Sequence, residues 1–299
     1  MKRGVAALFR KLGRCLSLLL VCAIIVAVPV LSFAQFGRTI FAHGPSRKAT
    51  PLPAFQVRAI DNTGKPVQLF SEPLVSVTFD DGWESVYQQA MPLLQTYGIH
   101  TTQYIISGNA DNPLYLSWDQ IATIQKSGHE IACHTVNHRN LTTLNDKDLQ
   151  AQLGGCLDTL GKRYGAIWDF ASPYGAENAH TLSAISKYFS SQRNTNGDPK
   201  NGVSDVDVNL ASNFNRYDII GVTVERNTSV AQLKSLVDYA KAHNAWVVLT
   251  YHQADDGNSQ YGLDPSELKK QLAFLSKSDI RIVTVHQALS SLPKTKGAN

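Results

Sequence analysis

At 299 residues the chain is longer than most single domains, but one α/β barrel of about 250 residues behind a leader accounts for the length. Its 28 basic and 24 acidic residues give a net charge of +4, yet five of the basic residues precede residue 35, where no acidic residue occurs. The 23 basic and 24 acidic residues that remain argue against a nucleic-acid-binding body.

Residues 1–34 have the layout of an export signal. A basic cluster is followed by the apolar run Cys15–Ser32 and by small residues up to Ala34, which suits a signal peptidase. The run of roughly 18 to 20 apolar residues is also long enough to span a bilayer as an uncleaved signal anchor. Both alternatives predict an exported protein that is secreted, periplasmic or anchored facing outward, with membrane contact only through this segment.

Residues 35–72 show little periodicity and contain several turn-forming residues. We interpret them as a tether followed by a short N-terminal arm, in which Asn62-Thr63-Gly64 makes the turn of a hairpin.

From Leu74 onward, short apolar segments alternate with amphipathic ones, a pattern that predicts strands separated by helices. Ser117 with Gln120 makes a capping box, Gly98 follows a helix end, and Pro265 suits a first helical turn. The expected strands are Leu74–Phe79, Thr102–Ile106, His129–Cys133, Ile167–Ala171, Tyr188–Gln192, Trp246–Tyr251 and Ile280–Thr284. The expected helices are Glu84–Tyr97, Trp118–Lys126, Asp146–Arg163, Asn178–Lys187, Val230–His243 and Ser266–Ser276.

This alternation predicts an α/β fold with a parallel sheet and crossover helices, either doubly wound or closed into a barrel. We assign it to one domain over residues 73–292, followed by a C-terminal tail at 293–299. Two of the four cysteines lie in the leader, which leaves Cys133 and Cys156 in this domain. An oxidising compartment permits them to pair, but sequence does not place their Cβ atoms, and we favour two buried thiols.

Polar residues follow the expected strands where each of them ends. Asp80 and Asp81 come after the first strand, His134 and His138 after the third, and His252 after the penultimate one. In both architectures functional groups collect at the carboxyl ends of parallel strands. The sequence therefore predicts that these side chains share one rim, together with the segment Pro173-Tyr174-Gly175 after the fourth strand.

The residue types at this rim suit metal-assisted hydrolysis. His134 and His138 are four residues apart and can face one ion, and one carboxylate completes a set that leaves a position open for water. The second aspartate is then free to act as a base. Taken separately, Asp81-Gly82 is also a common turn, the histidine pair could be surface chemistry, and His252 could be a core or capping histidine rather than a general acid.

The four segments together resemble the polysaccharide deacetylases of carbohydrate esterase family four, the NodB homology domain. The resemblance covers about Leu74 to Leu292 and implies a distorted (β/α) barrel that removes N-acetyl groups, mostly from N-acetylglucosamine polymers such as chitin, peptidoglycan or poly-N-acetylglucosamine. The motifs that carry it are Thr78-Phe-Asp-Asp-Gly82, His134-Thr-Val-Asn-His138, Phe170-Ala-Ser-Pro-Tyr-Gly175 and Leu249-Thr-Tyr-His252.

The resemblance also implies roles for these positions. Asp80 would be the general base and His252 the general acid, and the backbone N–H of Tyr174 would help to hold the oxyanion. Asp81, His134 and His138 would bind a divalent metal, Zn²⁺ first and Co²⁺ or Ni²⁺ as alternatives. Aromatic and turn residues beside them are candidates for substrate binding, namely Trp83, Pro173 and Tyr174.

Two departures from the family pattern affect these roles. The third motif usually begins with an arginine that pairs with the base, but Ala171 stands there, and we expect Arg193 after the next strand to supply the cation unless it is a surface residue. The fourth motif, an acidic pair and a tryptophan that orient the acid histidine, is not recognisable, and Asp198, Asp205 and Asp207 remain unranked candidates.

The variant motifs are closest to the poly-N-acetylglucosamine and cell-envelope branch of the family. We therefore expect an enzyme that acts on an acetylated polysaccharide, with no nucleic-acid partner. The alternatives are an O-acetyl esterase on xylan-like polymers and a non-catalytic glycan-binding scaffold. The oligomeric state stays open.

Overall fold

The computed structural model describes residues 70–292, apart from residue 213 and residues 256–258. These residues lie within one unit, Lys48–Asn299. The predicted leader, most of the tether and arm, and the C-terminal tail lie outside the described residues. Across the described segments, no helix combines the length and the apolar character needed to cross a membrane.

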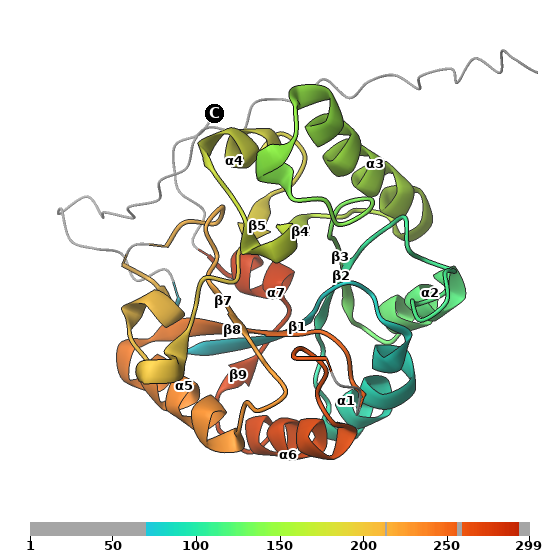
Figure 1. Ribbon diagram of the computed structural model, residues 1–299. Coiled ribbons are helices and arrows are strands. Elements are labelled where there is room, and N and C mark those ends of the chain that lie inside the picture. Colours follow the sequence, from blue (N-terminus) through green and yellow to red (C-terminus); the bar gives the residue numbers. More distant parts are fainter. Residues whose placement is uncertain (1–69, 213, 256–258, 293–299) are drawn as a thin grey trace, which may run out of the picture. The chain divides into compact units, whose positions relative to one another are not determined.

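Nine strands in the described part of the chain form one sheet, in which only the β6–β8 pair is antiparallel. The order runs β5-β4-β3-β2-β1-β8-β6, with β7 on β8 and β9 on β1. Bridges from Arg193 to Ile219 and from Gly197 to Val222 join the end of β5 to β7, so the strands curl into the predicted distorted barrel (Figure 1). The strands are β1 (Leu74–Phe79), β2 (Thr102–Ile105), β3 (Glu130–Cys133), β4 (Asp169–Ala171), β5 (Ser191–Arg193), β6 (Asn209–Leu210), β7 (Gly221–Thr223), β8 (Ala245–Tyr251) and β9 (Arg281–Ile282).

Helices surround this ring, and their ends follow the local signals in the sequence (Figure 1). Ser117 and Gln120 form the expected capping box at the start of α2, and Pro265 occupies the first turn of α6. Gly98 ends α1 in the left-handed conformation, with φ of 65°. The helices are α1 (Met91–Tyr97), preceded by a π-helical turn at Val86–Ala90, α2 (Trp118–Lys126), α3 (Asp146–Tyr164), α4 (Ala179–Ile185), α5 (Val230–His243), α6 (Pro265–Leu275) and α7 (Val285–Ser290).

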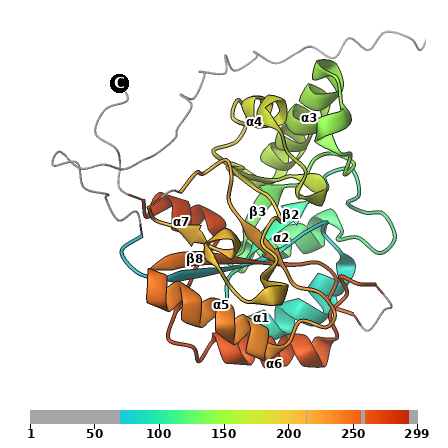
Figure 2. The ribbon, with the colours of Figure 1, turned by 60° about the vertical axis from the view of Figure 1, so that its left-hand side comes forward.

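The two faces of β1 have different environments. Val75 and Val77 pack in a hydrophobic cluster with side chains of α1, α5 and α6, which lie on one side of β8 in Figure 2. Ser76 and Thr78 point to the opposite face, because side chains alternate along a strand, and each hydroxyl donates to a backbone carbonyl oxygen. Apolar packing on one face and satisfied polar groups on the other hold β1 in register and bring its last residues to the rim.

The structure differs from the predicted elements in several places. β6, β7 and α7 were not predicted, and the two strands are too short to show a periodic pattern. The expected strand Ile280–Thr284 is shorter than predicted, because β9 spans only Arg281–Ile282. β5 begins at Ser191, three residues later than expected, so Arg193 belongs to the strand rather than following it.

Cys133 of β3 and Cys156 of α3 form a disulfide, so the preference for two buried thiols was wrong. Their Cα atoms are 6.2 Å apart, which a disulfide can bridge. The distance between the two cysteines depends on how α3 packs against β3. This contact joins residues 23 positions apart, and no local sequence pattern reveals it.

Candidate active site and metal centre

The structure brings the candidate side chains to one rim of the barrel. Asp80 follows β1, His134 follows β3 and His252 follows β8, while Arg193 is the last residue of β5. These strands run parallel, so their carboxyl ends meet at the same edge.

Three side chains at this rim offer ligand atoms to a single point. One atom from each of Asp81, His134 and His138 lies within 4.8 Å of the others. Oδ1 of Asp81 is 3.5 Å from Nε2 of His134 and 3.4 Å from Nε2 of His138. This oxygen is buried and has no hydrogen-bond partner among the described residues, which is costly for a carboxylate unless a cation lies beside it. An oxygen and two imidazole nitrogens fit Zn²⁺, Co²⁺ or Ni²⁺.

The backbone and a neighbouring indole aim Asp81 at this point. Asp81 is in the left-handed conformation with φ of 72°, and Gly82 follows with φ of 80°, so the chain turns sharply at the end of β1. The indole N–H of Trp83 donates to Oδ2 at 2.9 Å, which leaves Oδ1 facing the histidines. Trp83, a candidate for sugar binding, thus orients a candidate metal ligand, and one face of its ring stacks on Tyr115 with 4.6 Å between centroids.

The two histidines are held in a form that can bind a cation. Nδ1 of His134 lies 2.8 Å from the carbonyl oxygen of Ala171. A carbonyl oxygen can only accept a hydrogen bond, so Nδ1 carries the proton and Nε2 keeps a lone pair that can bind a cation. The backbone N–H of His138 donates to Oγ1 of Thr135 at 2.9 Å. Burial, together with the charge of His134, lowers the pKa of His138 to about 4, so its imidazole is neutral near pH 7.

Asp80 lies beside this set and is paired with a buried cation. One terminal nitrogen of Arg193 donates to Oδ2 of Asp80 at 2.5 Å and to Oδ1 at 2.6 Å. Both residues are almost fully buried, with exposures of 2% for Asp80 and 0% for Arg193. Burial raises the pKa of Asp80, but the positive charges of Arg193, His134 and His252 outweigh it, and the net pKa lies below the usual value. Asp80 is therefore ionised at neutral pH, as a base must be.

Arg193 lies beside the position at which the family pattern has its arginine. That position is Ala171, and Arg193 is in register with it on the adjacent strand. The absence of a side chain at Gly221 leaves space for the side chain of Arg193. A Cβ added at Gly221 would lie 2.6 Å from Cδ of Arg193 and 2.7 Å from the carbonyl oxygen of Asn194. The guanidinium also lies 4.9 Å from the ring centroid of Tyr104.

His252 faces the same rim from β8. Its Nδ1 is buried without a hydrogen-bond partner within the described residues, and its ring centroid lies 5.0 Å from that of Tyr261. Burial lowers the pKa of His252, and Asp80 and Asp81 oppose this only in part. When it is protonated, His252 is therefore a stronger acid than an ordinary imidazolium.

The acidic candidates for orienting His252 have other partners. Asp207 accepts hydrogen bonds from the backbone N–H groups of Asp198 and Ser204, and Asp205 accepts from a tyrosine hydroxyl of α5. Asp198 pairs with a lysine at 3.6 Å. Among the described contacts none of the three aspartates reaches His252, whose aromatic neighbour is Tyr261.

The segment after β4 separates into a buried and an exposed part. Pro173 is buried in a short 3₁₀ turn, which restricts it to shaping the backbone. Tyr174 is left-handed with φ of 61°, is 68% exposed, and places its ring 4.6 Å from that of His138. Of these two candidates for substrate contact, only Tyr174 presents its side chain to solvent.

Sequence reasoning missed Trp83 as a ligand-orienting group, Tyr261 as the neighbour of His252, and Gly221. A tryptophan two residues after the ligand aspartate was a usable local signal for Trp83. Gly221 belongs to β7, a strand distant in sequence from Arg193, whereas Tyr261 lies in a turn nine residues after His252. No local pattern marks either of them.

Comparisons with known proteins bear on this geometry. Residues 68–189 match the family model "Polysaccharide deacetylase". This range includes Asp80, Asp81, His134, His138 and Tyr174, but ends before Arg193 and His252.

The chain resembles curated relatives over part of its length and a solved structure over most of its length. It is 30% identical to YxkH of Bacillus subtilis (strain 168), which is named for the same family, over 39% of this chain and 42% of that protein. It is 31% identical to a peptidoglycan-N-acetylglucosamine deacetylase of Bacillus cereus over 33% of this chain and 42% of that protein. The chain therefore aligns with less than half the length of these relatives. The fold resembles the Xyl-CE4 domain of a xylanase from the hindgut metagenome of Trinervitermes trinervoides, with a TM-score of 0.50 and 20% identity, covering 74% of this chain and 91% of that one.

Proposed function

We propose that this chain is a metal-dependent hydrolase that removes N-acetyl groups from polysaccharides containing N-acetylglucosamine. The match of residues 68–189 to the polysaccharide deacetylase family model supports this proposal. The observation that carries the proposal is the approach of Asp81, His134 and His138 to one point beside the buried pair of Asp80 and Arg193.

Each side chain has a task in this reaction. Asp81, His134 and His138 would hold a divalent cation, which would supply Lewis-acid catalysis and lower the pKa of water toward about 7. Asp80, kept ionised by Arg193, accepts the proton of the attacking water. His252 gives a proton to the leaving nitrogen, and its low pKa favours that transfer.

Tyr174 completes the site at the turn after β4. We assign its backbone N–H to the developing oxyanion, because a fixed donor aimed at that charge stabilises the transition state. Its exposed ring, beside His138, offers an apolar face on which a sugar can stack.

The polymer is proposed from the relatives. They include a peptidoglycan-N-acetylglucosamine deacetylase, chitin deacetylases, and a bifunctional xylanase/deacetylase of Pseudobutyrivibrio xylanivorans. We place peptidoglycan-type or poly-N-acetylglucosamine polymers first. An ester of acetylated xylan is the second candidate, since the same activated water cleaves esters.

Acetate release tests this proposal. Purified protein is incubated with N-acetylglucosamine oligomers, peptidoglycan fragments and acetylated xylan, before and after treatment with a chelator and with Zn²⁺ restored. We expect release from the N-acetylated substrates, loss with the chelator, and recovery with Zn²⁺. Release from xylan alone would reassign the enzyme as an esterase. No release together with no bound cation would favour the non-catalytic scaffold.

We also propose that the protein is exported, on the strength of the basic and apolar leader at residues 1–34. The disulfide between Cys133 and Cys156 supports this location, because such bonds persist in oxidising compartments. Fractionation of cells that express a C-terminally tagged chain checks it, and a tag found only in the cytosol would contradict it.

A further inference from the structure

Residues 134–138 form a loop, here called the histidine loop, that supplies two of the three candidate ligands. Two of its residues are left-handed although neither is glycine, Thr135 with φ of 68° and His138 with φ of 57°. This conformation is unfavourable for a β-branched residue such as Thr135, so the loop keeps it only while its surroundings enforce it.

Hydrogen bonds from the segment after β2 hold one side of the histidine loop. The N–H of Ser107 donates to the carbonyl oxygen of Thr135 at 3.0 Å, and the N–H of Gly108 donates to that of Val136 at 2.7 Å. These bonds fix the backbone between the two histidines but leave both ends of the loop to other contacts.

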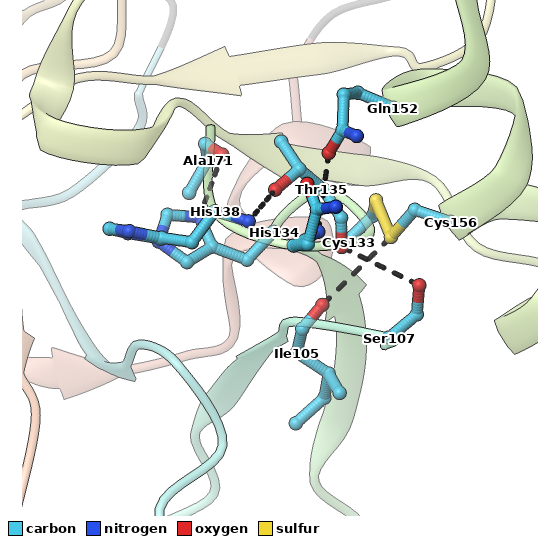
Figure 3. Close-up of a disulfide and its surroundings, with 10 residues drawn as sticks. Ile105, Ser107, Cys133, His134, Thr135, His138, Gln152, Cys156 and Ala171 are labelled. Carbon is cyan, nitrogen blue, oxygen red and sulfur yellow. Dashed lines mark hydrogen bonds between the residues drawn. A yellow bond between two sulfur atoms is a disulfide. The ribbon is translucent and has the colours of Figure 1, made fainter. Parts of the chain in front are cut away.

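Helix α3 holds the other side, partly through a covalent bond (Figure 3). Cys133, the residue before His134, is bonded to Cys156 of α3. One turn earlier on the helix, buried Gln152 accepts a hydrogen bond from the N–H of Asn137 at 3.2 Å. The histidine loop is therefore tied to α3 at a residue adjacent to each ligand.

The helix that carries these ties is itself firmly anchored. Leu149, Leu153 and Leu160 of α3 are buried in a hydrophobic cluster that also contains Cys133 and Cys156. Movement of the histidine loop away from α3 is thus prevented by a bond to a rigid element. Both sulfur-bearing residues are fully buried, so the bond lies inside the molecule.

We propose that the Cys133–Cys156 disulfide, assisted by Gln152, positions His134 and His138 and thereby sets the affinity of the site for its divalent cation. The inference rests on the proposed metal site. When the bond forms, the two thiols lose two electrons and two protons to a disulfide oxidant, which is reduced to two thiols. The chain with free thiols binds the cation more weakly, so metal retention follows the oxidising state of the compartment.

Metal affinity tests the proposal without reference to turnover. The Kd for Zn²⁺ is measured by competition with a chromophoric chelator for the wild type, the double variant Cys133→Ala/Cys156→Ala, and Gln152→Ala. Leu160→Ala is the matched control, because it removes a buried side chain of α3, one turn after Cys156, that forms neither a covalent bond nor a hydrogen bond with the histidine loop. The melting temperature of each metal-free protein is recorded, and bound Co²⁺ is followed by its absorption spectrum.

We expect the double variant to bind Zn²⁺ about 10- to 100-fold more weakly, as is usual when a group that orients a ligand is lost. Its Co²⁺ spectrum should change, and Gln152→Ala should show a smaller loss of affinity in the same direction. Leu160→Ala should melt earlier yet keep the wild-type Kd and spectrum.

Equal affinities of the wild type and the double variant would overturn the inference, and so would an equal loss in Leu160→Ala, which would show a general effect of stability. If the double variant does not fold, Gln152→Ala decides by the same criterion. A wild type that binds no cation would remove the proposed function as well, whereas a binding wild type with unaffected variants removes this inference alone.

Discussion

The guanidinium of Arg193 lies within 2.6 Å of both carboxylate oxygens of Asp80, although the two residues are 113 positions apart. Both are buried, so the pair is screened from water and each charge depends on the other. Arg193 of β5 is in register with Ala171 of β4, so the cation comes from the strand next to the one that carries the third motif.

Replacing Arg193 by alanine should change the pH profile of the reaction. Without the guanidinium, burial of Asp80 is no longer compensated, and the pKa of the base rises. A base works only when deprotonated, so the acidic limb of kcat/KM should move to higher pH, and the rate at neutral pH should fall by about 10²-fold or more. The measurement is acetate release between pH 4 and pH 9.

A matched control for that variant is Arg281→Ala, which removes a half-exposed arginine paired with Glu72. It should leave both rate and profile unchanged. Equal rates in the two variants would take Arg193 out of the mechanism.

Asp80→Asn should abolish turnover and keep the metal. The amide has nearly the same shape but cannot accept a proton from water, and Asp80 is not one of the three grouped ligands. We expect a loss of about 10²- to 10⁴-fold in kcat with unchanged Zn²⁺ content. Asp81→Asn is the comparison, since it should lower the Zn²⁺ content itself. A fully active Asp80→Asn protein would assign the base elsewhere.

Gly221→Ala should disturb the site by displacing Arg193. The new Cβ would meet Arg193, Asn194 and Thr250 at 2.6 to 2.9 Å, closer than such contacts allow, so the arginine or the strand must shift. We expect a loss of about 1–3 kcal/mol in the free energy of unfolding together with reduced activity.

Gly161→Ala is the matched control for Gly221, because it lies within α3 and its new Cβ has nothing within 4 Å. It should raise the free energy of unfolding by about 0.5–1 kcal/mol and leave activity alone. Equal stability of the two variants would show that β7 accommodates a side chain without cost.

His129 should make the protein less stable in acid. Its Nδ1 accepts a hydrogen bond from the N–H of Thr101 at 3.1 Å. Burial and, second to it, the charge of His100 lower the pKa of His129 to about 4. In the unfolded chain the pKa of His129 is about 6.5, so below that pH the unfolded state binds a proton that the folded state does not bind. Stability is therefore lost as the pH falls from about 6.5 to about 4, by about 1–3 kcal/mol from this residue.

His129→Asn keeps an acceptor for Thr101 and does not titrate. Urea unfolding at several pH values should show a shallower decline for this variant than for the wild type, and the two curves should run parallel above pH 7. Identical declines would mean that His129 contributes nothing to acid sensitivity.

The sequence alone was sufficient for features that depend on near neighbours. Alternation of apolar and polar residues identified β1, a short apolar run identified β8, and amphipathic segments identified most helices. Capping residues located helix ends, because caps reflect bonds within a few residues. The polar residues that follow those strands pointed to a single rim, since parallel strands present their carboxyl ends together. Asp80, Asp81, His134 and His138 could be proposed on this basis.

Only the tertiary structure decided the features that join distant segments. It placed Arg193 beside Ala171 and paired Cys133 with Cys156. Each of these depends on strand register or helix packing, and a shift of one residue along a strand turns a side chain to the opposite face. Local pattern names the residues that can do chemistry, whereas the distances between them follow from packing across the whole barrel.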